Sequence, residues 1–494
     1  MQGHSRRTVL IVLIGSALLG GQSAGAQQQT TPDSLRLTLS EAVDMALGQG
    51  NAAQAAEAAR DASLYQHDAF YSRLLPQLSF TGTVPAFNRS IIEVLQPDGS
   101  TLFRPQNQTS VQVGATVTQT LPFTGGDLFV SSGLRRVAVS GTQDVLTYSS
   151  TPVSVGLRQP IFRPNTVGWD MRAQPIRTET SARAYREARE NIAFETARMF
   201  FDVYAAQVEF ATATTNAAVN DTLYTLNNGR YEIGRIGEND LLQSELALLQ
   251  AQTAVEAAEL QLLQAQAALR LQLNVPDDTP IALTVSDRVP NFSVDTSVAI
   301  RQALRNRAAM SNVDLQNILA ERQIAEARLN NGFGATLQAS YGFNATAADL
   351  NGVYNDLLDR QQLTLSVELP LVQWGARSAE INAAQAALDA ANYQAQTTHD
   401  QTAHDARFAA LQQSLARRSL GLSAKGDTVA QKRFEVAYNR YVIGRITIDN
   451  LYLAQREKDQ ARQQYVRALR GFWEAYYQLR RVTLYDFEQN RPID

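Results

Sequence analysis

Hydrophobic and polar residues alternate with a period of two in several parts of the chain. The segment "SVQVGATVTQTL" (110–121) sets Val and Ala against Gln and Thr. The segments "PVSVGLRQPIF" (152–162), "TLQASYGF" (336–343) and "LTLSVELPL" (363–371) alternate in the same way. Successive side chains of a strand point to opposite faces, so this pattern predicts β-strands with one apolar and one polar face.

Between these segments the period is that of a helix. We expect an opening helix over residues 40–75, with Ser40 as its N-cap and Pro76 at its end. Longer helical patterns follow at 177–228, 240–273, 377–439 and up to about residue 479. The first of them, at about 1.5 Å per residue, would extend about 75 Å, far beyond the helices of most globular domains.

One phrase occurs twice. "RYEIGRIGENDLL" (Arg230–Leu242) returns 210 positions later as "RYVIGRITIDNLY" (Arg440–Tyr452), and Pro160 and Pro370 have the same offset. An earlier match, "AL" at 46 and 303, has an offset of 257, so the first copy holds 47 additional residues before Pro160. They include "GGDLFVSSGLRRVAVS", which is either an extra hairpin or an ordered loop. The order helix, strands, long helix, phrase, long helix therefore occurs twice, as an internal duplication.

The duplication divides the chain into a first repeat (35–273), a linker (274–294) and a second repeat (295–485). Residues 1–26 are predicted to be a secretory signal peptide, because a basic start and an apolar run precede an A-x-A site at 24–26. The alternative, an uncleaved membrane anchor, is disfavoured because the apolar run is too short to span a bilayer.

Composition narrows the class of function. The formal charge of −4 implies no electropositive surface for nucleic acid. The chain has no cysteine, which excludes disulfides, thiolate metal sites and a lipid-modified N-terminal cysteine. After residue 26 the sequence has no run of about 20 apolar residues, so no helical membrane span is expected.

The strands and the helices both require partners. A strand with one apolar face and one face of Thr, Ser and Gln matches a transmembrane β-barrel strand, although strands of a soluble β-sandwich also alternate. One chain offers four to six such strands, too few to close around a water-filled lumen, and lipid does not tolerate an open sheet edge. We therefore expect a mixed α/β membrane protein in which several chains pool their strands and bundle their long helices.

No catalytic, cofactor or metal site is predicted. His399 and His404 are five positions apart, off the spacing of four that one helix face needs for metal ligation. The sequence contains neither a nucleotide-binding glycine motif nor a nucleophile elbow. Because the carboxylates are scattered, the sequence gives no support to an enzyme.

The duplicated layout and the paired "RY-x-I-G-R-I" phrases, over about residues 35–485, resemble the TolC-like outer-membrane efflux protein family, the outer membrane factors. The resemblance implies a homotrimer with a 12-stranded transmembrane β-barrel in the outer membrane, continued by a long α-helical barrel across the periplasm. It also implies a passive exit duct of a tripartite efflux or type I secretion system, partnered by a periplasmic adaptor protein and an inner-membrane transporter. The rival interpretation is a trimeric periplasm-spanning tether or adhesin stalk with a β membrane anchor.

If the resemblance holds, the two phrases are helical tips at the inner end of the duct. Gly234 and Gly444 suit the left-handed turn that ends a helix. The gate bond of the family joins the tyrosine of the second tip to the aspartate of the first, which here are Tyr441 and Asp240, and we expect it in the closed state. Asp240 also fits a capping box with Gln243, so a purely structural role stays open.

The second tip departs from the family pattern. Asn450 stands where an aspartate is expected, Asp449 comes one place earlier, and Leu453 replaces a further acidic residue. The arginine that locks the tip is displaced to Arg445. A ring of three Asp449 carboxylates at the entrance, conferring cation selectivity, is the hypothesis that follows.

The tips are also the expected docking surface for the adaptor. Each combines a turn, an arginine and an apolar residue: Gly234, Arg235 and Ile236 in the first tip, and Gly444, Arg445 and Ile446 in the second. Alternating around a trimer, they would present six similar grooves. Turns with a solvated arginine are the alternative.

Overall fold

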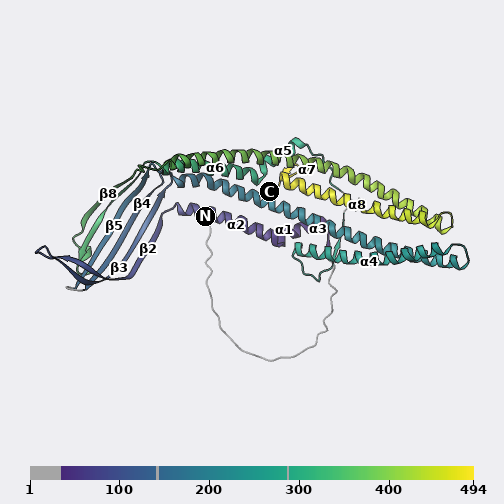
Figure 1. Ribbon diagram of the computed structural model, residues 1–494, viewed down its shortest axis with the longest axis horizontal. Coiled ribbons are helices and arrows are strands. Elements are labelled where there is room, and N and C mark those ends of the chain that lie inside the picture. The colour runs from purple at the N-terminus through teal and green to yellow at the C-terminus, as the bar shows by residue number, and fades with distance from the viewer. Residues whose placement is uncertain (1–34, 141–143, 286–288, 494) are drawn as a thin grey trace, which may run out of the picture.

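The computed structural model describes residues 35–140, 144–285 and 289–493. The predicted signal peptide, 1–26, lies outside the described residues. The molecule is elongated, with a β-sheet at one end and long helices that run from it to two tips at the other end (Figure 1). The mixed α/β fold expected from the sequence is confirmed.

The first half contains five strands and four helices within the described ranges. They are β1 (Leu35–Leu37), α1 (Leu39–Gln49), α2 (Asn51–Arg73), β2 (Gln77–Leu95), β3 (Thr101–Leu121), β4 (Gly126–Ser140), β5 (Val145–Ile161), α3 (Thr166–Glu232) and α4 (Glu238–Leu273).

The second half repeats the helical series with fewer strands. Its elements are β6 (Ile281–Leu283), α5 (Thr296–Asn306), α6 (Ala308–Asn330), β7 (Gly334–Ala347), the short 3-10 helix η1 (Gly352–Tyr354), β8 (Leu358–Glu368), α7 (Ala376–Val442), α8 (Ile448–Thr483), β9 (Tyr485–Asp486) and β10 (Arg491–Pro492).

The helices of the two halves match in length. α1 and α5 have 11 residues each, α2 and α6 have 23, α3 and α7 have 67, and α4 and α8 have 36. α5 and α6 begin 257 positions after α1 and α2, whereas α7 and α8 begin 210 positions after α3 and α4. The 47-residue difference therefore falls between α2 and α3.

The opening helix differs from the prediction at its start and in its middle. Thr38, not Ser40, is the N-cap, because its Oγ1 accepts from the amide of Glu41 while its own amide donates to the Glu41 carboxylate at 2.8 Å. This capping box satisfies amides that the first turn leaves free. Gly50 then separates α1 from α2, because its extended backbone interrupts the helix.

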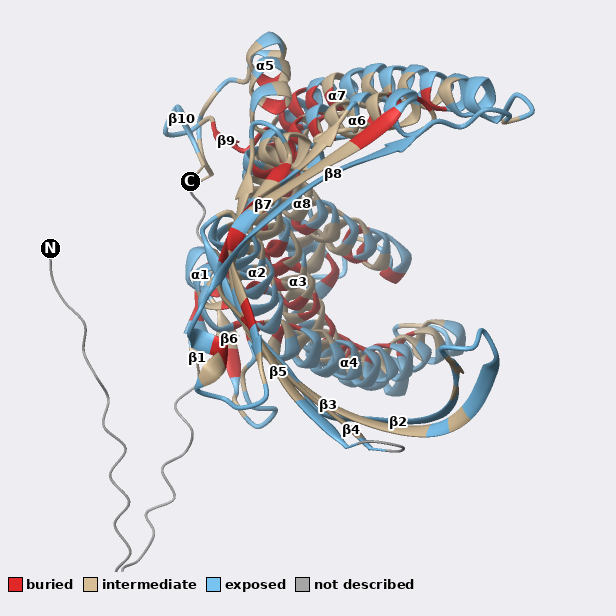
Figure 2. Cartoon of the chain, turned by 90° about the vertical axis from the view of Figure 1, so that its left-hand side faces the viewer, coloured by how far each residue is buried: buried red, intermediate tan, exposed pale blue. Residues whose placement is uncertain are grey.

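Six strands form one antiparallel sheet in the order β2-β3-β4-β5-β7-β8. The segment that the sequence left open between hairpin and loop is resolved as a strand, because β4 pairs with β3 on one side and β5 on the other. β2 and β8 are the edge strands, and nearly all of their side chains are exposed (Figure 2). The first half thus gives the sheet four strands and the second half two.

The hydrophobic core lies among the helices near the middle of the molecule. Its fully buried large side chains include Phe200, Phe201, Leu269, Leu273 and Phe472, from α3, α4 and α8. None of the helices in the described ranges combines the length and apolarity that crossing a membrane requires.

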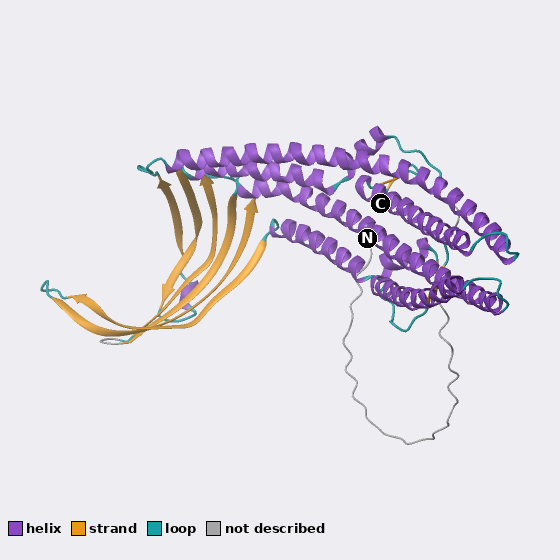
Figure 3. Cartoon of the chain, turned by 45° about the vertical axis from the view of Figure 1, so that its right-hand side comes forward, coloured by secondary structure: helices purple, strands orange, loops and turns teal. Residues whose placement is uncertain are grey.

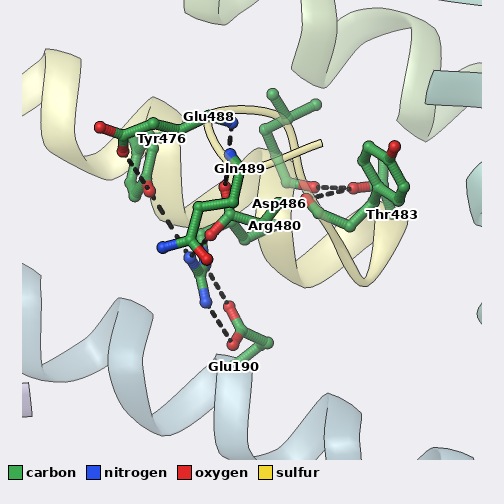
Figure 4. A network of polar contacts seen from close by, with 9 residues as sticks. Glu190, Tyr476, Arg480, Thr483, Asp486, Glu488 and Gln489 are labelled. Atoms are coloured by element: carbon green, nitrogen blue, oxygen red, sulfur yellow. Dashed lines mark hydrogen bonds and ion pairs between the residues drawn. The ribbon is translucent and has the colours of Figure 1, made fainter. Parts of the chain in front are cut away.

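A buried ion-pair network joins α3, α8 and the C-terminal strands (Figure 4). Arg480 donates to Glu190 at 2.9 and 3.1 Å and to Asp486 at 2.8 Å. Burial is the largest single effect and would lower the pKa of Arg480, but the hydrogen bonds and charge of Glu190 together with Tyr476 raise the pKa overall. Tyr476 lies beside the guanidinium, and burial raises the pKa of Tyr476 to about 12. The network fixes α3 against α8 at this level of the molecule.

Candidate functional site at the hairpin tips

Each tip is a tight turn between two long helices (Figure 3). After α3, the amide of Gly234 donates to the Tyr231 carbonyl at 2.9 Å and the amide of Arg235 to the Arg230 carbonyl at 2.8 Å. After α7, Gly444 and Arg445 make the same pair of bonds, both at 2.8 Å, to the carbonyls of Tyr441 and Arg440. This pair of backbone hydrogen bonds is the Schellman motif, which satisfies carbonyls that a helix end leaves free.

Both turns require glycine because of their backbone conformation, and not because a side chain would clash with its surroundings. Gly234 has φ of 65° and Gly444 has φ of 75°, a region that other residues adopt only with strain. A Cβ added to either glycine would meet nothing within 4 Å. The open surroundings leave the turns accessible from outside the chain.

Tyr441 is the central side chain of the tips. It is 5% exposed, and its hydroxyl donates to the Oδ1 of Asn227 on α3 at 2.7 Å. Leu223, Ile448 and Leu451 surround it with buried apolar surface. In the single chain, the partner of Tyr441 is therefore Asn227 and not Asp240.

Arg230 holds the same two helix ends together. Its guanidinium lies 5.2 Å from the centre of the Tyr441 ring and donates to the carbonyl of Val442 at 2.9 Å. A positive charge at the C-terminus of α7 is also stabilised by the helix dipole. Because Arg230 belongs to α3, this contact joins the two hairpins.

Asp240 is not the cap of α4, which corrects the capping-box interpretation. The N-cap is Gly237, which has no side-chain capping bond, and Asp240 lies within the first turn. Its carboxylate is half-buried and makes no hydrogen bond or ion pair with another described residue. A carboxylate in the first turn is favoured by the helix dipole, and it stays free for a partner outside the chain.

Asp449 makes a second link between the hairpins. Its Oδ1 accepts from the Nε2 of Gln243 on α4 at 2.8 Å. Asn450 beside it donates to the Oγ1 of Thr447 at 2.9 Å and so stays within its own turn. Of the expected tip residues, Arg235 and Arg445 are exposed, and Ile236 and Ile446 are half-buried.

Above the tips, polar side chains fill the interface between α3 and α8. Asn216 donates to Asp459 at 2.7 Å and Gln463 donates to Glu209 at 3.0 Å. These residues line a cavity of about 560 Å³, in which Oδ1 of Asn220 and Oε1 of Gln455 are buried and have no hydrogen-bond partner among the described residues. A polar interface of this kind resists separation less than an apolar core, because water can replace its bonds.

The sequence did not predict that Asn227, Arg230 and Gln243 make contacts between the two hairpins. Arg230 is the first residue of the repeated phrase, and Asn227 precedes it by three positions, so both lie on one face of α3. That spacing is the one sequence signal that could have pointed to them.

The comparisons with known proteins identify the family. Residues 127–275 and 299–483 match the sequence profile of the outer membrane efflux protein family. The match covers more than half of the chain, and the chain belongs to this family. Family membership places it in the outer membrane, and the members of this family are channel proteins.

Solved structures of outer-membrane proteins share the fold. The Campylobacter jejuni CmeC outer membrane channel is 16% identical, with a TM-score of 0.67 over 95% of this chain and 92% of that one. The Vibrio cholerae outer membrane protein VceC is 13% identical, with a TM-score of 0.65 over 92% and 97%. The open state of the Neisseria gonorrhoeae MtrE outer membrane channel is 16% identical, with a TM-score of 0.63 over 92% and 90%. No curated protein sequence gives a significant match.

Proposed function

We propose that three copies of this chain form the passive exit duct of a tripartite efflux or type I secretion system. The duct crosses the outer membrane through the pooled strands and reaches into the periplasm through the pooled helices. One observation carries the proposal. In the sheet and in the helices alike, one lateral edge of the chain is complementary to the opposite edge of a second copy.

The sheet edges fit a neighbouring copy. The six strands alternate in direction, so β2 and β8 run in opposite directions. β8 of one copy can therefore pair with β2 of the next in the antiparallel manner used throughout the sheet. Closure in this way leaves no backbone amide of an edge strand exposed to lipid.

The helix edges fit a neighbouring copy as well. α4 packs on α3, α3 on α8 and α8 on α7, which leaves α4 and α7 on the outside. The outer stripe of α7 repeats every seven residues, and each of its members is more than half exposed: Phe408, Leu415, Leu422, Val429 and Val436. α4 carries an exposed stripe with alternating steps of four and three residues, in which Thr253 and Glu256 interrupt the leucines: Leu242, Leu246, Leu249, Leu260 and Leu263. A seven-residue apolar repeat is the pattern of a coiled coil, so each stripe fits the other on the next copy.

Charges beside the stripes are opposite in sign. α7 exposes Arg418, Lys425 and Lys432, whereas α4 exposes Glu245, Glu256 and Glu259. Opposite charges flanking an apolar seam favour the pairing of α7 with α4 over the pairing of either helix with itself.

In this proposal the tips are the gate and the docking surface. Tyr441 with Asn227, and Arg230 with the α7 terminus, hold the two hairpins of one copy together. Asp240, free within the chain, is proposed to receive the Tyr441 hydroxyl in the closed trimer, where the tips are drawn together. The exposed turns at Gly234, Arg235, Ile236, Gly444, Arg445 and Ile446 are proposed to receive a periplasmic adaptor that links the duct to an inner-membrane transporter.

The proposal is tested by the native mass and the conductance of the protein without its signal peptide, extracted from outer membranes in detergent. A trimer that conducts ions in a planar bilayer is expected. A monomer, or recovery in the soluble fraction alone, would overturn the proposal. A trimer that never conducts, even with altered tips, would instead favour the tether or stalk.

A further inference from the structure

The first half of the chain contains an inserted β-hairpin. α2 and α6 lead into β2 and β7, and β5 and β8 lead into α3 and α7. The second half passes from β7 to β8, whereas the first half passes from β2 to β5 through β3 and β4. The β3–β4 hairpin therefore accounts for the 47 residues by which the two halves differ.

This hairpin is part of the sheet and not an appendage to it. β3 pairs with β2 from Thr101 to Thr118, and β4 pairs with β5. The hairpin thus separates β2 from β5. At the helical end of the sheet, the turn between β3 and β4 is held by Asn165, which donates to the Pro122 carbonyl at 2.7 Å, and by Gln159, which donates to the Thr124 carbonyl at 3.0 Å.

The two faces of the sheet continue across the hairpin. One row of directly paired residues is apolar from β2 to β7: Leu78, Val117, Val130, Val155 and Tyr341. A row on the other face is polar over the same strands: Thr83, Gln112, Arg135, Ser149 and Thr346. A transmembrane barrel strand has an apolar face toward lipid and a polar face toward the lumen, and β3 and β4 have both.

Aromatic side chains mark one level at the junction of sheet and helices. Phe123, in the turn between β3 and β4, is 96% exposed, and so is Trp374, in the turn before α7. Phe162, in the turn before α3, is exposed as well. Exposed aromatic residues form girdles at the membrane interface of such barrels, and the inserted hairpin contributes one of them.

We infer that the β3–β4 hairpin is built into the membrane wall, so that three copies enclose a pore of eighteen strands and not the twelve that the family resemblance implies. The inference rests on the trimer of the proposed function and deepens it. Barrel diameter grows roughly linearly with strand number, so the pore would be about 1.5 times wider and its cross-section about 2.2 times larger. Such a pore admits bulkier cargo at the membrane than a twelve-stranded one.

The hairpin also changes the charge of the pore. Arg104 on β3 and Arg135 on β4 lie on the polar face of the sheet, since Arg104 is eight residues from Gln112 on the same strand and Arg135 pairs with Gln112. Neither makes an ion pair with another described residue. Asp127 of β4 lies on the same face, so the insertion adds two arginines and one aspartate to the inner face of the pore, a net positive charge that favours anionic over cationic cargo.

Single cysteines test the position of the hairpin, because the chain has none of its own. Val113→Cys and Gln112→Cys on β3 are labelled with one fluorophore in the trimer reconstituted in lipid vesicles. Leu337→Cys and Gln338→Cys, on β7, are the matched controls. We expect nitroxide-labelled lipid to quench position 113 as it does 337, and aqueous iodide to quench position 112 as it does 338.

The outcomes separate this inference from the proposed function. Suppose that iodide quenches both β3 positions, that lipid quenches neither, and that the β7 controls behave as expected. This result would overturn the inference that the hairpin is part of the membrane wall, but it would not contradict the proposed duct. Failure of the β7 controls would overturn the membrane position of the whole sheet, and the inserted wall with it.

A deletion measures the width directly. Replacing residues 96–144 by an Asn-Gly turn joins β2 to β5 in a two-residue hairpin. If the trimer persists, we expect polyethylene glycol of a size that enters the wild-type pore from the outer side to be excluded from the variant. An unchanged size limit in a trimeric variant would overturn the inference, and the cysteine pairs decide the question if the variant does not assemble.

Discussion

Single side chains hold the tips together through contacts between residues that are far apart in the chain. Tyr441 is buried and hydrogen-bonded to Asn227, and the buried Nδ2 of Asn227 has no partner in the part of the chain that the structure describes. Tyr452 lies beside Tyr441, and burial raises the pKa of Tyr452 to about 12. A polar group buried without a partner costs about 1–3 kcal/mol, so the tip has little stability to lose before its helices separate.

Removal of the Tyr441 hydroxyl is the first test of the gate. Tyr441→Phe leaves Oδ1 of Asn227 unpaired, and a loss of about 1–3 kcal/mol at the tip should raise the open fraction of the channel. Single-channel recording should show more frequent or larger openings, and Asp240→Ala should act in the same direction. Tyr438→Phe, in the same cluster, is the control. If both Tyr441→Phe and Asp240→Ala left conductance unchanged, the gate would lie elsewhere.

Charge at the entrance is tested at Asp449. Asp449→Asn removes three carboxylates from a trimer and weakens the bond from Gln243. Reversal potentials in a potassium chloride gradient should therefore shift toward lower cation preference. Gln243→Ala, which leaves the carboxylate in place, is the matched control. Equal selectivity of wild type and Asp449→Asn would contradict the proposed ring of Asp449 carboxylates.

Whole elements show why the two halves of the chain need neighbours. Helices 67 residues long cannot be stabilised by one short core, and the exposed apolar stripes of α7 and α4 are the surface that remains for packing. The sheet also needs neighbours, because its edge strands β2 and β8 each leave one side unpaired in the single chain and nearly all of their side chains are exposed. The largest cluster of buried apolar side chains among the described residues is the one that contains Phe200, with members from α1, α3, α4 and α8.

The helix stripe is tested by Leu422→Glu. Leu422 is 75% exposed, so the substitution removes no core contact within the chain, but it places charge in the proposed seam. Native mass should fall from trimer to monomer while the helical content by circular dichroism stays the same. Ser414→Glu, at an exposed position of α7 that is off the seven-residue repeat, should keep the trimer. A trimer of Leu422→Glu with unchanged stability would rule out this seam.

The Arg480 region has a pH dependence of defined sign. The pKa of Tyr476 is about 12 in the folded chain and about 10 when unfolded, so folding disfavours the tyrosinate. The stability that results is full below pH 10 and is lost as pH rises toward 12, by up to about 1.4 kcal/mol per pH unit. Denaturation midpoints of wild type should fall more steeply above pH 10 than those of Tyr476→Phe. Parallel curves would contradict this assignment.

Periodic features could be predicted from the sequence, and contacts across the duplication could not. The repeated phrase located both turns, because a positive φ limits the residue to glycine. β4 stayed undecided because Gly126 and Gly133 weaken its strand pattern, and pairing on both sides settles it. Asn227 and Arg230 escaped notice because their partners lie more than 200 residues away.

At the scale of the whole molecule, the proposed duct assigns different tasks to the sheet and the helices. The six-stranded sheets would fix the width and inner charge of the outer end, whereas the hairpin tips would fix access at the inner end. Two regions so far apart can change independently, so the insertion can alter the pore without disturbing the gate.

The inner charge of the pore is tested with the double variant Arg104→Gln and Arg135→Gln. Loss of positive charge from the inner face should move the reversal potential toward cations while the polymer size limit stays constant. Arg136→Gln, on the opposite face of β4, is the matched control and should leave selectivity unchanged. Equal effects of the double variant and the control would show that the polar face does not line the pore.

The equal lengths of α3 and α7 have a consequence for how such a protein can evolve. At about 1.5 Å per residue, 67 residues measure about 100 Å, and both tips must arrive at the same depth to meet. Tyr441 could not reach Asn227 if one helix gained a turn and the other did not. In the proposed trimer the two helices would therefore reach the same depth in the periplasm, and any insertion or deletion in α3 would require an equal change in α7.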